Sequence, residues 1–298
     1  MKKFSVMHTW LKEIRANFLV LPVALVMIGG AAAYCEDIFN PVLFIITLFG
    51  VTAAHISVNL FNEYSDWRTG IDERTKRTPF SGGSGNLQKG LIAPGHVRTA
   101  AWVTLALAFF TGAGLLAVSG WQVMIFMALG GVTVVIYTDY LTKCMLGEIA
   151  AGFALGSLVV LGAYYVQAGS LTSTIVWASI APGLLTMLLL LLNEFPDAEA
   201  DKVGGRRHLV IVLGKQRAAV VYSILLASVY IILVLGVITG ELPGTVLISL
   251  ATIPFAAGAM YHALRYANDS ERIVTALGLN VIVVLATDFL IALGFLLG

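Results

Sequence analysis

Long apolar runs separated by polar segments constrain the fold of this chain more than any other feature. A helix needs about 20 apolar residues to cross the roughly 30 Å hydrocarbon layer of a bilayer. Windows of that length fit nine times into the sequence, at residues 16–34, 41–61, 98–118, 121–138, 148–168, 172–192, 218–239, 244–264 and 276–297. The runs are too long and too continuous for the alternating strands of a barrel. We therefore predict an all-α polytopic membrane protein with nine transmembrane helices in one bundle.

Composition supports this class. Of the 298 residues, 58% are hydrophobic and 12% are charged, whereas soluble domains carry about a quarter charged residues. A soluble protein of this composition would lack the polar residues needed to cover its surface. The net charge of +1 and the absence of a basic run give no indication of nucleic-acid binding. No linker or low-complexity segment divides the chain, so we expect a single domain over residues 1–298, with the first apolar segment retained as a helix.

The positions of the charges predict the topology. With the N-terminus in the cytoplasm, the inside segments are residues 1–15, 62–97, 139–147, 193–217 and 265–275. All 18 Lys and Arg residues lie in these segments or at their boundary, where Arg98 opens the third window. The only charged residues in the predicted outside connections are the acids Glu36, Asp37 and Glu241. The positive-inside rule therefore predicts an integral cell-membrane protein with a cytoplasmic N-terminus and an outside C-terminus. Cys35 and Cys144 fall on opposite sides, so we expect no disulfide.

Two of the inside segments are long, and each begins with a cluster of acids where an apolar run ends. The sequence NEYSDWRTGID at 62–72 follows the second window, and NEFPDAEAD at 193–201 follows the sixth. Each cluster opens with Asn-Glu and places an Asp four residues after the Asn. Such weak internal duplication in a membrane protein often places a site at the interface between the two repeats.

The first cluster needs a break in the helix if its acids are to meet. Asn62 and Asp66 share a helix face. Asp72 lies six residues beyond Asp66, about 240° around an ideal helix. A helix end at Gly70 would allow the chain to turn and bring Asp72 back, because Gly readily ends a helix.

The second cluster has a simpler spacing. Asn193, Asp197 and Asp201 step by four residues and form one stripe on a helix. Pro196 removes a hydrogen-bond donor and crowds the carbonyl of Leu192, so we expect the helix to kink or end there. Both acidic clusters are therefore predicted to lie where helical backbone is interrupted, in loops after the second and sixth helices.

Acids gathered near a membrane repel one another unless a cation holds them. Oxygen ligands from Asp and Asn favour Mg²⁺, which completes its shell with water and phosphate oxygens. Basic residues follow both clusters: Arg68, Arg74, Lys76, Arg77, Lys202, Arg206 and Arg207. Acids for Mg²⁺ and cations for phosphate oxygens together predict a diphosphate site. The glycine-rich stretch PFSGGSG at 79–85 would add backbone donors.

At these residues the chain resembles the UbiA superfamily of intramembrane prenyltransferases, which carry two Asp-rich cytoplasmic motifs after helices 2 and 6. The long gap between Asp66 and Asp72, and the run GRRHLVIVLG after the second motif, are most similar to the dihydroxynaphthoate branch of that superfamily. The resemblance implies that Mg²⁺ and a prenyl diphosphate bind between the motifs, that the diphosphate ionises, and that the allylic cation passes to an acceptor.

The resemblance also implies roles for individual residues. The metal ligands would be Asn62, Asp66, Asp72, Asp197 and Asp201, and the four aspartates among them would be catalytic. The substrate-binding residues would be Asn62, Arg68, Lys76, Arg77, Tyr137, Lys143 and Asn193. Tyr137 and Lys143 come from YTDYLTK, which is similar to a family stretch after helix 4. Two features depart from the family pattern: Glu63 replaces the usual Asp, and the proline of the loop between helices 4 and 5 is missing.

These observations predict a Mg²⁺-dependent transfer of a polyprenyl group from a prenyl diphosphate to a hydrophobic acceptor, most readily an aromatic quinone precursor. The implied partners are the prenyl diphosphate, the lipophilic acceptor and the lipid bilayer. Two alternatives stay open. The acceptor could be a glycerol-phosphate lipid, or the acids could be the ion ligands of a cation transporter, which would place them at mid-depth on broken helices.

Several other residues carry weaker signals. We expect His55 to have a packing or hydrogen-bonding role, and Asp288 in the last window to hydrogen-bond between helices. Asp139 and Glu148 flank the loop between the fourth and fifth windows, and we expect both to be solvated. The GxxxG pattern at 152–156 predicts close helix packing.

Overall fold

The computed structural model describes residues 6–298, so Lys2 and Lys3 of the predicted cytoplasmic end lie outside the described residues. Within that range the chain is helical and contains no strand, as predicted. The elements are α1 (Val6–Glu13), η1 (Ala16–Leu19), α2 (Val20–Cys35), α3 (Pro41–Thr69), α4 (Ile71–Arg74), α5 (Pro94–Ser119), α6 (Val123–Ile136), η2 (Leu141–Lys143), α7 (Gly147–Ala150), the π-helical η3 (Ala151–Ser157), α8 (Leu158–Ala168), α9 (Ser173–Val203), α10 (Leu209–Leu213), α11 (Lys215–Ile238), η4 (Gly244–Thr252), α12 (Ile253–Tyr266) and α13 (Ile273–Leu297).

Eight helical stretches within the described residues are long and apolar enough to cross a membrane. They are Ala16–Cys35, Pro41–Thr69, Pro94–Ser119, Gly147–Ala168, Ser173–Val203, Lys215–Ile238, Gly244–Tyr266 and Ile273–Leu297. The predicted fourth window, 121–138, contains α6, which has only 14 residues. A helix of that length is shorter than the roughly 20 residues that a span needs, so helix length supports eight of the nine predicted spans.

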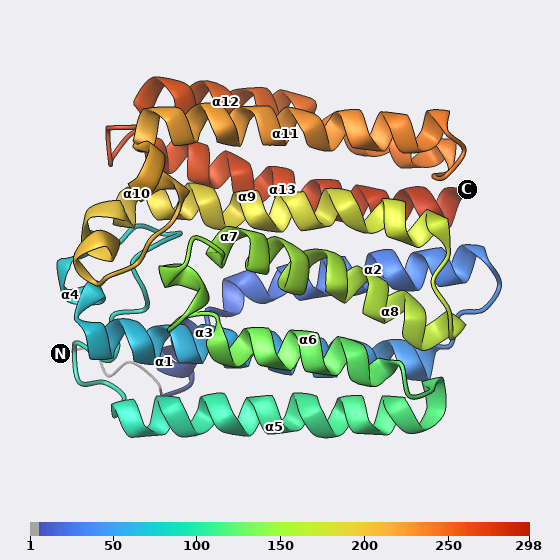
Figure 1. Cartoon of the computed structure of the whole chain (residues 1–298), viewed down its shortest axis with the longest axis horizontal. Helices are drawn as coiled ribbons and strands as arrows, with labels where there is room; N and C mark the ends of the chain where they lie inside the picture. The colour runs from blue at the N-terminus through green and yellow to red at the C-terminus, as the bar shows by residue number, and fades with distance from the viewer. Residues whose placement is uncertain (1–5) are drawn as a thin grey trace.

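The long helices run side by side along one axis and form one bundle (Figure 1). The α5 helix lies along one edge, α11 and α12 lie along the opposite edge, and α9 runs between them (Figure 1). Apolar residues of α9 form the centre of the core, where Leu185, Leu188 and Leu192 are fully buried. The short helices α4 and α10 lie at one end of the bundle, and the C-terminus lies at the other (Figure 1).

The α3 helix has clear start and stop signals. At its start, the Asn40 side chain accepts hydrogen bonds from the backbone N–H groups of Val42 and Leu43, at 2.9 and 3.2 Å, and Pro41 takes the first helical position. At its end, Gly70 adopts a left-handed conformation with φ of 70°. The predicted helix break at Gly70 is confirmed, and Asp72 lies on the separate short helix α4.

The α9 helix does not end at Pro196. It runs for 31 residues, through Pro182 and Pro196, to Val203, so the prediction of an interruption was wrong. Packing overrides the lost hydrogen bond, because Phe195 is fully buried and Ala198 is 5% exposed on either side of the proline. The second acidic cluster is therefore an extension of a spanning helix rather than a loop.

The first cluster is helical too. Asn62 and Asp66 lie within α3, and only Asp72 lies beyond its end. The prediction of Asp-rich loops after the second and sixth helices is corrected accordingly. Continuation of the helices past their apolar windows fixes the acids on rigid backbone at one end of the bundle.

Close packing at the GxxxG pattern is confirmed. A Cβ atom added to Gly152 would lie 2.7 Å from the carbonyl oxygen of Gly183, and one added to Gly156 would lie 2.8 Å from the Gly183 Cα. The η3 and α9 backbones can approach this closely only because these positions lack side chains. Cys35 and Cys144 are both free and exposed, in agreement with the expected lack of a disulfide.

Two expectations for single acids were wrong. Glu148 is 1% exposed rather than solvated, because its Oε1 accepts a hydrogen bond of 2.7 Å from the backbone N–H of Leu209 in the buried region beside α9. Asp288 is fully buried, and neither of its carboxylate oxygens finds a hydrogen-bond donor within residues 6–298. Asp139 is half-exposed, and it accepts hydrogen bonds from Ser65 at 2.7 Å and Arg68 at 2.8 Å.

Candidate active site

A polar cavity of about 180 Å³ lies where α3 and α9 extend past their apolar windows. Its wall includes seven of the residues predicted to bind metal or substrate: Asn62, Asp66, Asp72, Tyr137, Asn193, Asp197 and Asp201. The two acidic clusters, distant in sequence, thus face one space. The structure therefore brings residues of both clusters to the wall of one cavity.

The corner at Gly70 positions the first half of the site. Asp66 and Asp72 are 5% and 3% exposed, and both line the cavity from the two sides of the corner. The glycine-rich loop lies against Asp72, because a Cβ atom on Gly83 would overlap its carboxylate. The Gln88 side chain donates a hydrogen bond of 3.1 Å to Asp72 Oδ2. Burial, together with the negative charge of Glu63, raises the pKa of Asp72 to about 6.

One guanidinium joins the two halves. Arg206 donates through Nη1 to Asp201 Oδ1 at 2.9 Å and through Nη2 to Asp66 Oδ1. Its backbone N–H donates to the carbonyl of Asp201 at 2.9 Å, and the next N–H, of Arg207, donates to the carbonyl of Thr142 at 2.8 Å. Burial alone would lower the pKa of Arg206, but the charges of Asp66 and Asp201 outweigh it and raise that pKa above its usual range.

A second cation reaches the site from the N-terminal segment. Arg15 donates to Glu63 Oε1 through Nε at 2.8 Å and to Asn62 Oδ1 through Nη2 at 3.1 Å, and it lines the cavity. Glu63 Oε2 in turn accepts a hydrogen bond of 2.9 Å from the backbone N–H of Ser84. The glutamate that departs from the family pattern therefore anchors the glycine-rich loop. The Ser84 hydroxyl also donates to Glu13 of α1 at 2.7 Å.

Four of the expected substrate-binding residues do not line the cavity: Arg68, Lys76, Arg77 and Lys143. Arg68 pairs with Asp139 at 2.8 Å, and Lys76 pairs with Glu271 at 2.9 Å, both at the surface. Arg77 folds onto the glycine-rich loop and donates to Gln88 Oε1 at 3.2 Å. Arg206 was expected only as a basic neighbour of the second cluster, with no assigned role in the site. Arg15 was not expected at the site, because it carries no local signal and its contact with Asn62 spans 47 positions of the sequence.

The residues present fit a bound Mg²⁺. Asn193 Oδ1 and Asp197 Oδ1 are buried, and no hydrogen-bond partner reaches either atom from residues 6–298. Unsatisfied buried oxygens are costly, and carboxylate and amide oxygens are the ligands that Mg²⁺ prefers. Arg15 and Arg206 supply fewer positive charges than the acids that line the cavity supply negative ones, so a divalent cation would offset the excess.

An apolar cavity of about 310 Å³ adjoins the polar one. Residues of α3, α5, α6, η3 and α8 line it, including Phe109, Phe126 and Met127. His55 and Leu155 line both cavities, so the two spaces meet at these side chains. His55 is 8% exposed, and its place at this junction goes beyond the packing role expected from sequence.

The sequence pattern of the UbiA prenyltransferase family matches residues 21–282. This chain belongs to that family. It is an integral multi-pass membrane enzyme of the prenyltransferase class. Among its relatives, the 1,4-dihydroxy-2-naphthoate octaprenyltransferase of Escherichia coli K12 is 28% identical over 243 residues, which cover 78% of each chain. The 2-carboxy-1,4-naphthoquinone phytyltransferase of a Synechocystis species is 26% identical over 276 residues, which cover 89% of this chain and 85% of the relative.

Solved structures show the same fold. The apo structure of a UbiA homologue from Aeropyrum pernix matches with a TM-score of 0.72 at 17% identity, over 94% of this chain and 98% of the other. A UbiA homologue from Archaeoglobus fulgidus, solved with GPP and Mg²⁺, matches with a TM-score of 0.61 at 14% identity, over 95% of this chain and 99% of the other. The UbiA prenyltransferase fold thus extends over nearly the whole chain.

Proposed function

We propose that this UbiA prenyltransferase transfers a polyprenyl group from a prenyl diphosphate to an aromatic, naphthoate-type acceptor in a Mg²⁺-dependent reaction. The observation that carries the proposal is the junction of the two cavities at His55 and Leu155. One substrate with a charged head and a long apolar chain fits a site that is acid- and arginine-lined on one side and apolar on the other. The relatives named for a naphthoate and a naphthoquinone acceptor support the acceptor class.

The polar cavity would bind the diphosphate. Asn62, Asp66, Asp72, Asp197 and Asp201 would hold Mg²⁺, which when bound offsets the charge of the phosphate oxygens and of the leaving group. The guanidinium groups of Arg15 and Arg206 lie in the same cavity wall, where they can donate to diphosphate oxygens. Cations fixed in place before the reaction stabilise the negative charge that gathers as the carbon–oxygen bond breaks.

The apolar cavity would bind the prenyl chain and shield the reacting carbon from water. The chain lies among aliphatic and aromatic side chains, and His55 marks the point where it enters from the polar side. Loss of diphosphate leaves an allylic cation, which a dry site protects from capture by water. The Tyr137 ring, 8% exposed and in the polar cavity wall, can stabilise such a cation.

The two alternative functions have less support. A glycerol-phosphate acceptor would need a second phosphate site, whereas the two relatives described above are named for a naphthoate and a naphthoquinone acceptor. A cation transporter conflicts with membership of a transferase family. The acids also lie at helix extensions at one end of the bundle rather than at its mid-depth (Figure 1).

We also propose that α6 crosses the membrane as a ninth, short span, with the N-terminus and the active site in the cytoplasm and the C-terminus outside. The confinement of Lys and Arg to alternate connections supports this topology. The two exposed cysteines provide the test, because Cys35 would face outside and Cys144 the cytoplasm. An impermeant thiol reagent applied to sealed right-side-out vesicles should label Cys35 alone. Labelling of both cysteines, or of Cys144 alone, would contradict the topology.

The central experiment incubates purified protein with labelled geranylgeranyl diphosphate, Mg²⁺ and a panel of acceptors, and identifies the product by mass. We expect a prenylated naphthoate product and no prenylated glycerol phosphate. Asp66→Asn and Asp197→Asn should abolish product formation while the protein still inserts in the membrane. Glu199→Gln is the matched control, since Glu199 is an exposed acid on α9 between the two aspartates of the second motif. Full activity of either aspartate variant would refute the proposed site.

A further inference from the structure

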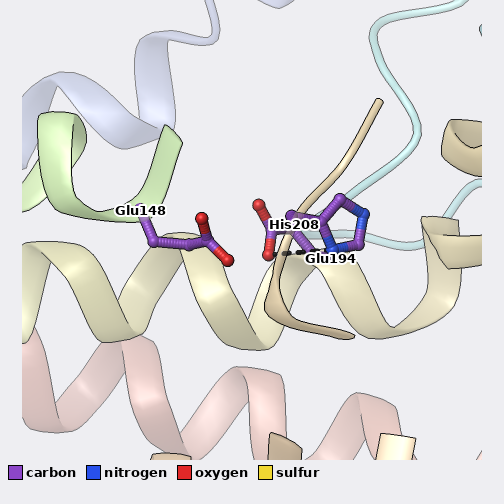
Figure 2. A group of neighbouring side chains, drawn as sticks. All are labelled: Glu148, Glu194 and His208. Atoms are coloured by element: carbon purple, nitrogen blue, oxygen red, sulfur yellow. Dashed lines mark ion pairs between the residues drawn. The ribbon is translucent and has the colours of Figure 1, made fainter. Parts of the chain in front are cut away.

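A cluster of ionisable side chains lies beside the Asp-rich site, and none of its members is among the proposed Mg²⁺ ligands. Glu148 comes from the start of α7, Glu194 from α9 and His208 from the residue before α10. One ligand atom from each of the three lies within 4.8 Å of the other two. Figure 2 shows the Glu148 carboxylate directed toward Glu194, and His208 joined to Glu194 by an ion pair. Three segments distant in the sequence thus converge on one point.

The cluster is buried and poorly satisfied. Glu148 and His208 are 1% and 2% exposed, and the Glu194 side chain is 11% exposed. Three buried atoms of the cluster make no hydrogen bond within residues 6–298: Nδ1 and Nε2 of His208, and Oε2 of Glu194. Nδ1 of His208 lies 3.3 Å from Glu194 Oε2, so the imidazole is next to the carboxylate. The Arg206 guanidinium is the cation that acts on Glu194, but it is bound to Asp66 and Asp201, and buried carboxylates with too few counter-charges are strongly unfavourable.

The imidazole of His208 is shared between acids of the cluster and of the Asp-rich site. Its two nitrogens lie between Glu194 Oε2 and Asp201 Oδ2, each at 3.3 Å, so one positive charge would already be shared by two acids. Glu148 accepts a hydrogen bond from the backbone N–H of Leu209, and no cation pairs with its carboxylate among the ion pairs of the described residues. A divalent cation among the three side chains would instead neutralise both glutamates and use the imidazole as a neutral ligand.

We propose that Glu148, Glu194 and His208 form a second metal site, distinct from the Asp-rich site, for a divalent ion of the Zn²⁺ class. Imidazole with carboxylate is a donor set that suits Zn²⁺, whereas Mg²⁺ prefers oxygen ligands alone. Zn²⁺ binds oxygen and nitrogen ligands at about 2.0–2.2 Å, so small rotations of the glutamate side chains close the group on an ion. The hydrogen bond from Leu209 already fixes the orientation of Glu148.

The site lies at the wall of the polar cavity. Glu194 and His208 line that cavity, and the Glu148 carboxylate lies within 4.8 Å of both. Three protein ligands would therefore hold the ion, and the fourth position is left to water or to an oxygen atom of a molecule in the cavity. Three protein ligands with one open position are the pattern of zinc sites that bind substrates. The inference concerns metal binding alone and does not depend on the proposed transfer reaction.

The test measures bound metal rather than activity. Purified full-length protein is stripped with a chelator, then dialysed against a series of Zn²⁺ concentrations in the presence of saturating Mg²⁺, and its metal content is measured by mass spectrometry. We expect about one Zn²⁺ per chain, with affinity reduced at least 10-fold in Glu148→Gln and in His208→Gln. Asp72→Asn, which alters the Asp-rich site on the separate helix α4, should keep the Zn²⁺. Co²⁺ in place of Zn²⁺ should give the visible absorption of a four-coordinate ion, lost in the same two variants.

Zn²⁺ binding by the wild-type protein is the first measurement that decides the proposal. Failure of the wild type to retain Zn²⁺ against Mg²⁺ overturns the proposal, and so does wild-type affinity in a folded His208→Gln variant. Loss of Zn²⁺ in Asp72→Asn would assign the ion to the Asp-rich site and also overturn it. Gel filtration and thermal unfolding, with Glu199→Gln as the matched surface control, establish that the variants are folded.

Discussion

Replacing Arg206 by Gln should destabilise the protein strongly in the absence of Mg²⁺ and much less in its presence. The guanidinium is the one group that contacts an acid from each of the two motifs, Asp66 and Asp201, in the described part of the chain. Gln keeps a hydrogen-bond donor but removes the charge. The two carboxylates would then be left buried without their shared cation.

The magnitude follows from the burial of the pair. The side chains of Asp66 and Asp201 are 6% and 3% exposed, and that of Arg206 is 15% exposed. Removing one partner of a buried ion pair costs about 3–5 kcal/mol. For a chain of this size, each kcal/mol lowers the melting temperature by about 2–4 °C. We therefore expect a fall of about 6–20 °C in metal-free buffer.

Mg²⁺ should restore much of this loss, because it can take over the carboxylates that Arg206 has released. A ligand present at 100 times its dissociation constant stabilises the folded state by about 2.7 kcal/mol. In the wild type, Mg²⁺ must share Asp66 and Asp201 with the guanidinium, so it should bind more weakly there than in Arg206→Gln. Thermal unfolding of the detergent-solubilised protein with and without Mg²⁺ measures both effects. Arg207→Gln, at an exposed neighbouring position, is the control and should change neither.

The reasoning would be refuted by an equal Mg²⁺-induced rise in melting temperature in the wild type and in Arg206→Gln. Such a result would show that the guanidinium and the metal do not compete for the same acids. An unchanged melting temperature of the metal-free variant would show that the ion pair contributes little to stability.

Three further predictions concern the loop, the apolar cavity and pH. Gly83→Ala should lower kcat/KM at least 10-fold, because the added Cβ would overlap the Asp72 carboxylate, whereas Gly90→Ala should not, since its Cβ meets no atom within 4 Å in the described chain. Gly130→Phe should fill the apolar cavity and abolish turnover of long prenyl diphosphates while short ones still react; Gly114→Phe, outside the cavity, should have little effect. Because the pKa of Asp72 is raised to about 6, protons should compete with Mg²⁺ below that pH, and Mg²⁺ affinity should fall as pH is lowered through it.

Each of these has a clear contrary outcome. Gly83 and Gly90 both have a positive φ, at 67° and 65°, so equal losses in the two variants would assign the effect to backbone strain rather than to Asp72. Equal loss of short and long substrates in Gly130→Phe would place the prenyl chain elsewhere. Mg²⁺ affinity that does not change between about pH 7 and pH 5 would contradict a shared role for the proton and the metal at Asp72.

The parts of the fold that depend on local chemistry could be predicted from the sequence. The apolar windows located the spanning helices because their length is set by the bilayer. The spacing of Asp66 and Asp72 required a break, and Gly70 supplied it with a left-handed backbone. Pro196 predicted an interruption of the helix that does not occur, because burial of the neighbouring Phe195 and Ala198 keeps the helix continuous.

The contacts that complete the site could not be predicted, because they join segments far apart in the chain. Arg206 meets Asp66 across 140 residues, and Arg15 meets Asn62 across 47. Glu148 was predicted to be a solvated loop residue, because its hydrogen-bond donor, the backbone N–H of Leu209, is 61 residues away in the sequence. For each of these residues, side-chain type and local pattern fit a solvated surface as well as a buried site, and only the packing of α3 and α9 with the segments around them distinguishes the two.

The corner at Gly70 has a consequence for how acidic motifs of this kind are compared. Asp66 and Asp72 lie on two separate helices, so the dihedral angles of one glycine, more than the number of residues between the acids, determine where the second acid points. A chain with a shorter or longer gap can present the same pair of carboxylates if its corner turns by a matching amount. The number of residues in the motif therefore predicts the distance between the two carboxylates poorly, and the geometry of the turn predicts it better.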